Sequence, residues 1–355
     1  PLPYMPTVQG GVLSTQQEID APFNVGALKL VPYVMGQGNY WEQDINGNPL
    51  GRLWGSAGIR GSIEAQKAMP NIYSDVLGLR GLNHKMVFDF DLYDAQSNQP
   101  LSLIPSYNEF DDQAQLRFRN RLLIDTFGGT MPPQFDPRFF AVRTGAAYDV
   151  TSPYNELVAS QEALRLGWRH RLQTKVGPYD NPRIVDWMTL DLDATFFPNA
   201  NRDNFGQHWG LLTGRYNWNM SERTTFFANA LYDLYPGAEQ LWSAGIVSQR
   251  TQRGSVYLGV RQVKGAGLNS EILTASYSYQ MSPKWMTTVG TAYDIAEQRN
   301  RGQSLTLTRV GADFLFHIRA NFDQSKNNAG IMFSIEPKLF ANPAMGAAQQ
   351  YGPLF

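Results

Sequence analysis

The sequence of 355 residues has no cysteine and only four histidines. Without thiols, disulfide bonds and thiolate metal sites are excluded. The histidines do not form the H-x-x-H or H-E-x-x-H spacings that place two metal ligands on one helix face. We therefore expect no histidine metal site and no cofactor. The four histidines are His84, His170, His208 and His317.

Long apolar runs and an excess of charge are also missing. No stretch reaches the ~18 apolar residues of a transmembrane helix, and the formal net charge is −1. A chain this close to neutral has no basic field that would attract nucleic acid. The opening residues, PLPYMPTVQG, lack the basic and apolar regions of a signal peptide. If the protein is exported, we expect this chain to be a processed or truncated form.

Signatures of catalysis are scarce. The chain has no G-x-S-x-G nucleophile elbow and no glycine-rich nucleotide-binding loop. A Ser-His-Asp triad is recognised by geometry, and no serine–histidine pair stands out. The segment from Asp44 to Asn48 resembles a calcium loop but lacks its distal glutamate, so an Asn-Gly turn explains it better. We predict that the protein is not an enzyme.

Glycine and aromatic residues are abundant instead, with 32 glycines and 13% aromatics. Many segments alternate with a period of two, which puts alternate side chains on opposite faces of a strand. In LRLGWRHRL (164–172), apolar residues and histidine alternate with arginine and glycine. This pattern predicts roughly 14 to 16 strands. They lie near residues 31–41, 51–63, 83–93, 114–124, 138–148, 161–175, 183–197, 206–219, 223–234, 239–251, 254–264, 269–280, 284–296, 303–313, 314–323 and 328–338.

Strand lengths and connections indicate how these segments assemble. Many are ~9–14 residues long, whereas strands of soluble sheets average ~5–6 and ~9–11 tilted residues cross a bilayer. Tight turns at 220–223 and 281–284 contrast with long connections at 95–114, 126–137 and 146–161. Short turns on one rim and long loops on the other are typical of outer-membrane barrels.

The predicted fold is therefore all-β: a transmembrane antiparallel β-barrel in the cell outer membrane, complete in itself or part of a larger barrel. It spans residues 25–340, after an N-terminal linker over 1–24 and before a tail over 341–355. Short helices are expected over 109–116 and 154–163. A large soluble β-sandwich or β-solenoid is the alternative, which the strand lengths disfavour.

One hairpin occurs twice. YNWNMSERTTFFANALYDL (216–234) and YSYQMSPKWMTTVGTAYDI (277–295) share an aromatic pair, a Met-Ser turn and a closing Tyr-Asp. A hairpin that crosses a membrane needs aromatic anchors near both headgroup layers. We predict such anchors beside the tight turns and about one crossing away. The residues are Tyr216, Trp218, Tyr277, Tyr279 and Trp285 beside the turns, with Tyr232 and Tyr293 at the other level.

Arginines recur at a period of two in Arg117 and Arg119, and in Arg165, Arg169 and Arg171. A charge facing hydrocarbon costs ~2–4 kcal/mol near the midplane, so these arginines are predicted to face the lumen. Guanidinium forks suit phosphates, which predicts contact with phosphate-bearing cargo. The simpler interpretation, which we favour, is that they pair with lumenal carboxylates. The candidates are Asp186, Asp191, Asp193 and Asp313.

The last predicted strand, NAGIMFSI (328–335), matches the signal that the barrel-assembly machinery reads in outer-membrane proteins. Its residues are Asn328, Gly330, Phe333 and Ile335. Usually the signal stands at the very end of the chain, whereas here a tail follows.

Several segments resemble the barrel of the lipopolysaccharide-assembly (LptD, organic-solvent-tolerance) family. They are GLNHKMVF (81–88), YDAQSNQP (93–100), LRLGWRHRLQTKVG (164–177) and WMTLDLD (187–193). The resemblance implies an outer-membrane translocon that inserts lipopolysaccharide, with a plug lipoprotein and a periplasmic bridge protein as partners. Two departures, the missing cysteines and the short chain, imply the C-terminal part of such a barrel or a reduced relative.

A porin-like diffusion channel or a structural outer-membrane barrel is the alternative function. A lateral gate needs a weak seam between strands, and prolines weaken a seam because they remove ladder donors. Pro32 lies in an early strand and Pro337 ends the last one, which mildly favours the translocon.

Overall fold

The computed structural model describes residues 10–105, 137–144, 150, 157–221, 223–238, 240–265, 268–324 and 327–337. These residues form one sheet of sixteen strands, in which every paired strand is antiparallel to its neighbour. The prediction of an all-β antiparallel fold is confirmed. The strands are β1 (Val12–Asp20), β2 (Phe23–Val25), β3 (Leu28–Trp41), β4 (Leu50–Ser74), β5 (Leu79–Ser97), β6 (Gln161–Val176), β7 (Arg183–Phe196), β8 (Trp209–Ser221), β9 (Thr224–Tyr232), β10 (Gln240–Gln249), β11 (Gly254–Gly265), β12 (Leu268–Ser282), β13 (Trp285–Asp294), β14 (Arg299–Val310), β15 (Phe314–Asp323) and β16 (Asn328–Pro337).

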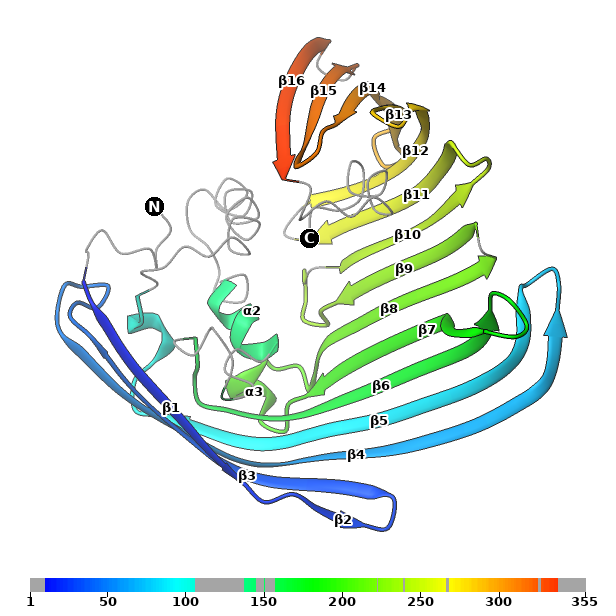
Figure 1. Ribbon diagram of the computed structural model, residues 1–355. Coiled ribbons are helices and arrows are strands. Elements are labelled where there is room, and N and C mark those ends of the chain that lie inside the picture. Colours follow the sequence, from blue (N-terminus) through cyan, green and yellow to red (C-terminus); the bar gives the residue numbers. More distant parts are fainter. Residues whose placement is uncertain are drawn as a thin grey trace.

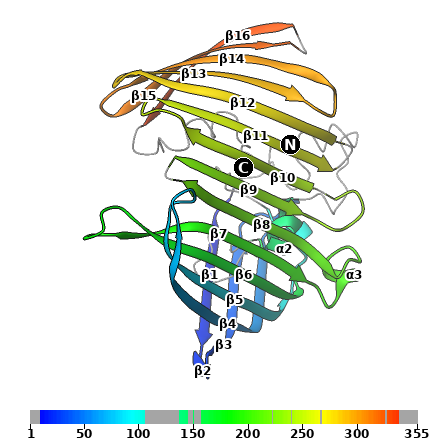
Figure 2. The same ribbon diagram turned by 90° about the vertical axis from the view of Figure 1, so that its right-hand side faces the viewer.

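From β3 to β16 each strand pairs with the next one along the chain, so the sheet is a meander that curves like the wall of a barrel (Figures 1 and 2). Fifteen of the sixteen strands pair in series from β1 to β16, and β2 pairs with β3 off this path. Among the described residues β1 and β16 do not pair with each other, and they lie at opposite ends of the sheet (Figure 1).

The sheet has an apolar outer face and a concave face of different character. Phe88, Trp168 and Leu192 pair across β5, β6 and β7 in one row. The neighbouring row on the opposite face is Asp89, Gly167 and Asp193. Outer side chains are exposed, for example 45% for Phe88. The two-residue period of the sequence therefore sets the polarity of the two faces.

The described helices of the connection between β5 and β6 lie on the concave face of the sheet (Figure 1). They are the 3-10 helix η1 (Leu101–Leu103) and the helix α2 (Pro137–Thr144). Leu101, Ile104 and Val142 pack there against Trp41 and Leu50 of the sheet. This buried cluster supplies a core inside the curve of the wall.

Two predicted elements are wrong. The strand expected over 138–148 is replaced by α2 as far as Thr144. Eight residues are too few to separate a period of 2 from one of 3.6, and Phe139 and Val142 in fact share one helix face toward the cluster. The helix expected over 154–163 is absent from its described part, because β6 begins at Gln161.

The N-terminal segment expected as a linker over 1–24 contains β1 and most of β2. Both pair with β3, and Asp20 opposite Tyr33 and Phe23 opposite Leu30 keep one register. The edge strand is therefore continuous in register across Ala21 and Pro22. Five predictions lie outside the described residues: the helix over 109–116, the strand over 114–124, Arg117, Arg119 and the tail over 341–355.

The connections fall at two rims. We call the rim at residues 75–78, 177–182, 250–253 and 311–313 the short-turn rim, and the opposite one the long-loop rim. The long-loop rim carries the connection from 98 to 160 and the one from 197 to 208, which includes the helix α3 (Ala200–Asp203). In the second half of the sheet the connections at both rims are short, so the predicted asymmetry holds only for the first half.

The segment from Asp44 to Asn48 is a turn between β3 and β4. Asp44 Oδ1 accepts hydrogen bonds from the backbone N–H of Asn46 (2.7 Å) and of Asn48 (2.9 Å). These backbone donors, that of Asn48 first, lower the pKa of Asp44. Gly47 has a φ of +86°, which glycine adopts at no steric cost. Turn chemistry thus accounts for the residues that resemble a calcium loop.

Candidate functional site on the concave face

Three of the five predicted lumenal arginines are described, and all three lie on the concave face. Arg169 forms an ion pair with Asp193, and Arg171 forms one with Asp191 at 2.8 Å. Arg169 Nε also lies 3.9 Å from Asp89. The prediction that these arginines pair with aspartates is thereby met for Arg169 and Arg171, and in both pairs the register of β6 and β7 places the partner diagonally across.

Two predicted carboxylates have other surroundings. Asp186 accepts a hydrogen bond from the side-chain amide of Gln173 at 2.8 Å instead of pairing with an arginine. Asp313 lies in the turn between β14 and β15, at the short-turn rim of the other half of the sheet. A β-bulge between Leu172 and Gln173 shifts the register before Asp186, and the sequence pattern does not reveal it.

Gly167 makes the charged cluster possible. A Cβ at this position would lie 2.1 Å from Asp89 Oδ2, so any larger residue would displace that carboxylate. The glycine leaves space between Asp89 and Asp193, into which Arg169 extends from the same strand. The only sign of this arrangement in the sequence is that glycine stands at 167, where the alternation of Arg165, Arg169 and Arg171 would place another arginine.

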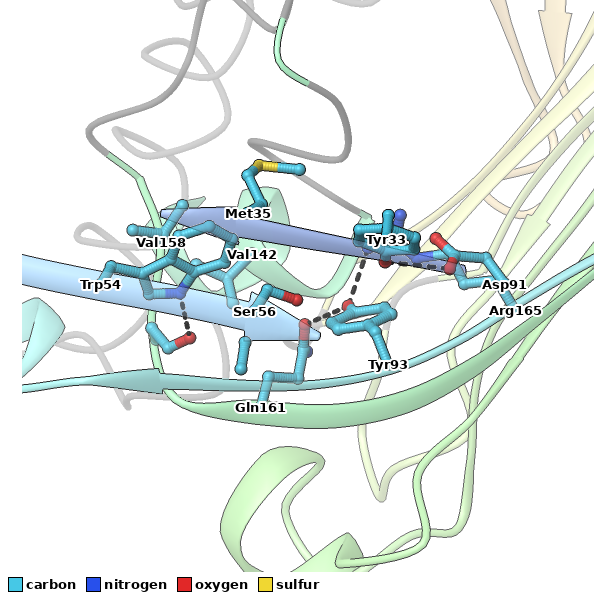
Figure 3. Close-up of a pocket in the computed structure, with 12 residues that line it drawn as sticks. Tyr33, Met35, Trp54, Ser56, Asp91, Tyr93, Val142, Val158, Gln161 and Arg165 are labelled. Atoms are coloured by element: carbon cyan, nitrogen blue, oxygen red, sulfur yellow. Dashed lines mark hydrogen bonds between the residues drawn. The ribbon is translucent and has the colours of Figure 1, made fainter. Parts of the chain in front are cut away.

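A second polar cluster surrounds Arg165 (Figure 3). Arg165 donates to the hydroxyl of Tyr93 at 2.9 Å, and Tyr93 donates to Gln161 Oε1 at 2.6 Å. Tyr33 of β3 reaches past β4 and donates to Asp91 Oδ1 of β5 at 3.0 Å. Arg165 is therefore held in part by a buried tyrosine, Tyr93.

The cavity drawn in Figure 3 is a packed junction rather than a ligand pocket. Its volume is about 20 Å³, which is room for one water molecule. Met35 and Trp54 close it, and the indole N–H of Trp54 donates to the carbonyl of Ala159 at 3.2 Å. Sequence reasoning missed this cluster, although β3 and β4 carry large apolar residues on both faces, as in Val34 beside Met35 and Leu53 beside Trp54.

A buried ion pair fastens α2 to the loop that follows β9. The guanidinium of Arg143 donates to both carboxylate oxygens of Asp233, at 2.5 and 2.8 Å. Their side chains are 2% and 3% exposed. The rings of Phe205 and Tyr235 lie about 5.5 and 5.4 Å from the same guanidinium. Arg143 thus links α2 to two loops of the long-loop rim.

Across the middle of β12 to β14 the concave face carries hydroxyl groups, and the buried pair Asp294–Arg301 lies at the long-loop end of these strands. Ser278, Thr288 and Thr306 pair in one row across these strands. Ser278 Oγ and Thr288 Oγ1 lie 2.9 Å apart in a hydrogen bond, and Thr306 Oγ1 accepts from Arg319 Nε at 3.3 Å. These small side chains are 6% exposed or less. This half of the face is a hydroxyl surface with few ion pairs.

The seven predicted aromatic anchors all lie on the outer face. The register pairs Tyr277 with Val289 and Tyr216 with Ala228, in rows that contain only outer-face residues. Tyr232 and Tyr293 lie at the opposite ends of their hairpins from the tight turns. The placement agrees with two levels of aromatic residues, while their role at a membrane interface stays a prediction. The remaining members, Trp218, Tyr279 and Trp285, follow the same alternation.

The predicted assembly-signal residues lie in β16, which among the described residues pairs with β15 alone. Phe333 and Ile335 are on the outer face, 74% and 65% exposed. The equivalent Ile318 in β15, which has neighbours on both sides, is 43% exposed. Asn328 and Gly330 lie on the concave side of the same strand. Whether an assembly machine reads them stays a prediction.

The described residues contain no group of three or more histidine, cysteine, aspartate or glutamate side chains arranged to hold a metal ion. His84 and His170 do meet, with ring centroids 4.5 Å apart, but the register places them on the outer face among apolar residues. Among the described helices none is long and apolar enough to cross a membrane.

No protein-family model matches the sequence, and no curated protein matches it either. Similar solved structures include the copper transporter OprC, at 12% identity over 88% of this chain and 51% of that one, with a TM-score of 0.29. FpvA of P. aeruginosa bound to heterologous pyoverdines is 9% identical over 92% and 48%, with a TM-score of 0.27. The Pseudomonas putida toluene transporter TodX is 10% identical over 88% and 81%, with a TM-score of 0.22.

This chain spans about half the length of the first two of these structures. At such scores the likeness carries no argument about function.

Proposed function

We propose that this chain forms the wall of an outer-membrane β-barrel that transports cargo across or into that membrane. The observation that carries the proposal is the division of the sheet into an apolar outer face and a polar concave face. In the middle of β5, β6 and β7, six charged residues share the concave face while the outer face is apolar. They are Asp89, Asp91, Arg165, Arg169, Asp191 and Asp193. A charge on a lipid-facing position would cost ~2–4 kcal/mol near the midplane.

Cell fractionation tests this placement. The protein should sediment with outer membranes and migrate as a β-rich species whose gel mobility changes on heating. A folded, monodisperse protein in buffer without detergent would contradict it, because the outer face would then be exposed to water.

The finer proposal is that the cargo is lipopolysaccharide. Support comes from the resemblance of the segments 81–88 and 164–177 to the lipopolysaccharide-assembly family. The β1–β3 seam adds support, because Pro32 accepts a hydrogen bond from the N–H of Ala21 at 3.1 Å but has no N–H to return. A seam that lacks one ladder bond separates more easily, as lateral release of a glycolipid requires. A plug lipoprotein, a periplasmic bridge protein and the barrel-assembly machinery are the partners that this proposal includes.

A porin-like diffusion channel is the second candidate, and a purely structural barrel is a third. The ion pairs Arg169–Asp193 and Arg171–Asp191 favour the channel, since paired arginines offer less charge to a phosphate. The inward-folded connection with α2 would narrow such a channel, as it lies on the concave face.

Photocrosslinking in cells separates the two functions. Crosslinkers at Arg165, Arg169 and Arg171 should capture lipopolysaccharide if it passes the concave face. Crosslinkers at Leu166 and Trp168, on the opposite face of the same strand, should capture mainly membrane lipid. No lipopolysaccharide adduct at the arginines, together with uptake of small solutes in a liposome-swelling assay, would favour the channel.

Assembly can be tested independently at β16. Phe333→Asp places a charge on the outer face of this strand, whereas Ser334→Asp places the same charge on the concave face. We expect Phe333→Asp to leave little folded protein in the membrane and Ser334→Asp to be tolerated. Equal levels of both variants would argue against the predicted assembly signal.

A further inference from the structure

A cavity of about 330 Å³ lies at the short-turn rim, between the ends of two hairpins. One is the long β4–β5 hairpin, whose end bends toward the β6–β7 hairpin (Figures 1 and 2). Residues from both hairpins line it, among them Tyr73, Arg80, Lys175 and Tyr179. Its volume is in the range of small-molecule sites, which begins near ~300 Å³. We call it the hairpin pocket.

The walls of the hairpin pocket are fixed by hydrogen bonds between the two hairpins. The N–H of Arg80 donates to Thr174 Oγ1 at 2.9 Å, and that hydroxyl donates to the carbonyl of Gly81 at 2.8 Å. The guanidinium of Arg80 donates to the carbonyl of Gly177 at 2.7 Å. Nearby, the indole of Trp187 donates to the carbonyl of Leu77 at 3.0 Å. The pocket is therefore preorganised rather than a gap between loose turns.

A ladder of side-chain amides forms part of its wall. Gln66 donates to Asn83 (3.1 Å), Asn83 to Gln173 (3.3 Å), and Gln173 to Asp186 (2.8 Å). This ladder crosses four strands, and Asn83 and Gln173 line the pocket. Asp186 lies at the end of the ladder, where its carboxylate accepts the hydrogen bond from Gln173. The ladder holds the strands in register beneath the pocket.

Two cations line the pocket without a carboxylate partner. Within the described residues neither Arg80 nor Lys175 forms an ion pair. The guanidinium of Arg80 lies 4.8 Å from the centroid of Tyr179, whose side chain is 85% exposed. The remaining lining includes Pro70 and Ile184. The pocket therefore has a cationic part, formed by a guanidinium and an ammonium, and an apolar part, formed by aromatic and aliphatic groups.

We propose that the hairpin pocket binds an amphiphilic phosphate, that is, a phosphomonoester carried on an apolar body. Arg80 and Lys175 would hold the phosphate through charge-assisted hydrogen bonds, and Tyr73, Tyr179 and Ile184 would cover the apolar part. The site lies apart from the Arg169 cluster, and its assignment stands whether the barrel transports glycolipid or small solutes.

The test is a binding titration with the full chain in dodecyl maltoside, an uncharged detergent. Dodecyl phosphate is added and followed by ³¹P NMR, with inorganic phosphate titrated in parallel. We expect saturable binding of one dodecyl phosphate, at least about tenfold tighter than inorganic phosphate because of the buried apolar body. Lys175→Gln and Arg80→Gln should each weaken it about tenfold, as expected for one lost hydrogen bond between charged groups.

Arg183→Gln is the matched control, because Arg183 lies at the same rim but does not line the pocket. It should change the dissociation constant less than about twofold. Arg80→Gln removes the bond to Gly177, so the exposed Lys175 is the deciding position. Three results would each overturn the proposal: no saturable binding, equal affinity for inorganic phosphate, or an Arg183→Gln effect as large as that of Lys175→Gln.

Discussion

The concave face of β4 to β8 and the concave face of β10 to β14 are built from different side chains. The first carries arginines, aspartates and tyrosines, and an inward-folded connection packs against it. The second carries mainly serine and threonine, such as Ser278, Thr288 and Thr306, with a hydroxyl contact between strands. Its few charged residues include Arg261 and Asp294. Both halves have an apolar outer face and the same antiparallel pairing.

The difference shows that the same antiparallel sheet with an apolar outer face can carry two different sets of side chains on its concave face. Where Arg169 crosses Gly167 toward Asp193, the charges must be placed precisely enough to satisfy one another, and each depends on a neighbouring strand. Where Ser278 meets Thr288, two small groups satisfy each other locally. We call β4 to β8 the charged half and β10 to β14 the hydroxyl half. We infer that the charged half holds its geometry through a few strong contacts and the hydroxyl half through many weak ones.

The largest effect is expected at the link between α2 and the long-loop rim. Arg143→Ala would leave the carboxylate of Asp233 buried and unpaired, which costs ~3–5 kcal/mol in the free energy of unfolding. Urea unfolding of the protein in lipid vesicles measures this loss. Arg299→Ala is the control, because the Arg299–Glu297 pair is about half exposed and should contribute less than ~1 kcal/mol.

A double variant sharpens the Arg143 prediction. Arg143→Met with Asp233→Leu removes both charges and keeps similar volume, so it should recover most of the lost stability. If the single variant is no less stable than the wild type, then α2 does not depend on this ion pair and the charged half is not held as described.

A smaller effect is expected in the middle of the charged half. Asp193→Asn removes the partner of Arg169, whose side chain is about one third exposed. We expect a loss of about 1 kcal/mol in the free energy of unfolding, reduced by solvent screening. A double-mutant cycle with Arg169→Gln measures the pairwise part, and a coupling close to zero would show that the two charges are merely adjacent.

The hydroxyl half should respond less. Thr288→Val leaves Ser278 without its hydroxyl partner and should cost about 1 kcal/mol or less in the free energy of unfolding. The double variant with Ser278→Ala should be nearly neutral, because both partners are then apolar. A larger loss in the double variant than in Thr288→Val would contradict the view that these contacts are local.

Salt provides the mildest comparison of the two halves. Raising the ionic strength from 0.01 to 1 M shortens the Debye length from ~30 to ~3 Å. Amide hydrogen exchange should speed up slightly, about twofold, in β5 to β7 and stay unchanged in β10 to β12. Equal acceleration in both halves would mean that the ion pairs do not stabilise their own strands.

The strands could be predicted because apolar and polar residues alternate wherever the two faces of a strand lie in different environments. Fourteen predicted segments correspond to observed strands, and β6 and β15 lie within a residue of their predicted bounds. β4 and β5 extend well beyond the predicted 51–63 and 83–93. Most of these additional residues form the end of the long β4–β5 hairpin, where the sequence alternates less regularly.

The site was predictable only in part, since sequence gives the face of a residue but not its partner. The arginines of β6 were placed on the correct face, and Asp191 and Asp193 were among the named partners. The bulge between Leu172 and Gln173 places Asp186 beside Gln173 instead of beside an arginine. The ion pair of Arg143 and Asp233 joins segments that are far apart in the sequence. Neither contact leaves a periodic signal in the sequence. The hairpin pocket was missed for the same reason, because it forms where two distant hairpins meet.

The number of strands in series decides how this wall can become a ring. Fifteen antiparallel strands begin and end in the same direction, so β1 and β16 both run from the long-loop rim to the short-turn rim. Direct contact between these two edges would be parallel, and a second copy inserted the same way up would also present a parallel edge. An all-antiparallel ring therefore takes an odd number of further strands between β16 and β1. Whichever segment supplies them, the strand that pairs with β16 must run from the short-turn rim to the long-loop rim. Its side chains next to Phe333 must be apolar and face outward.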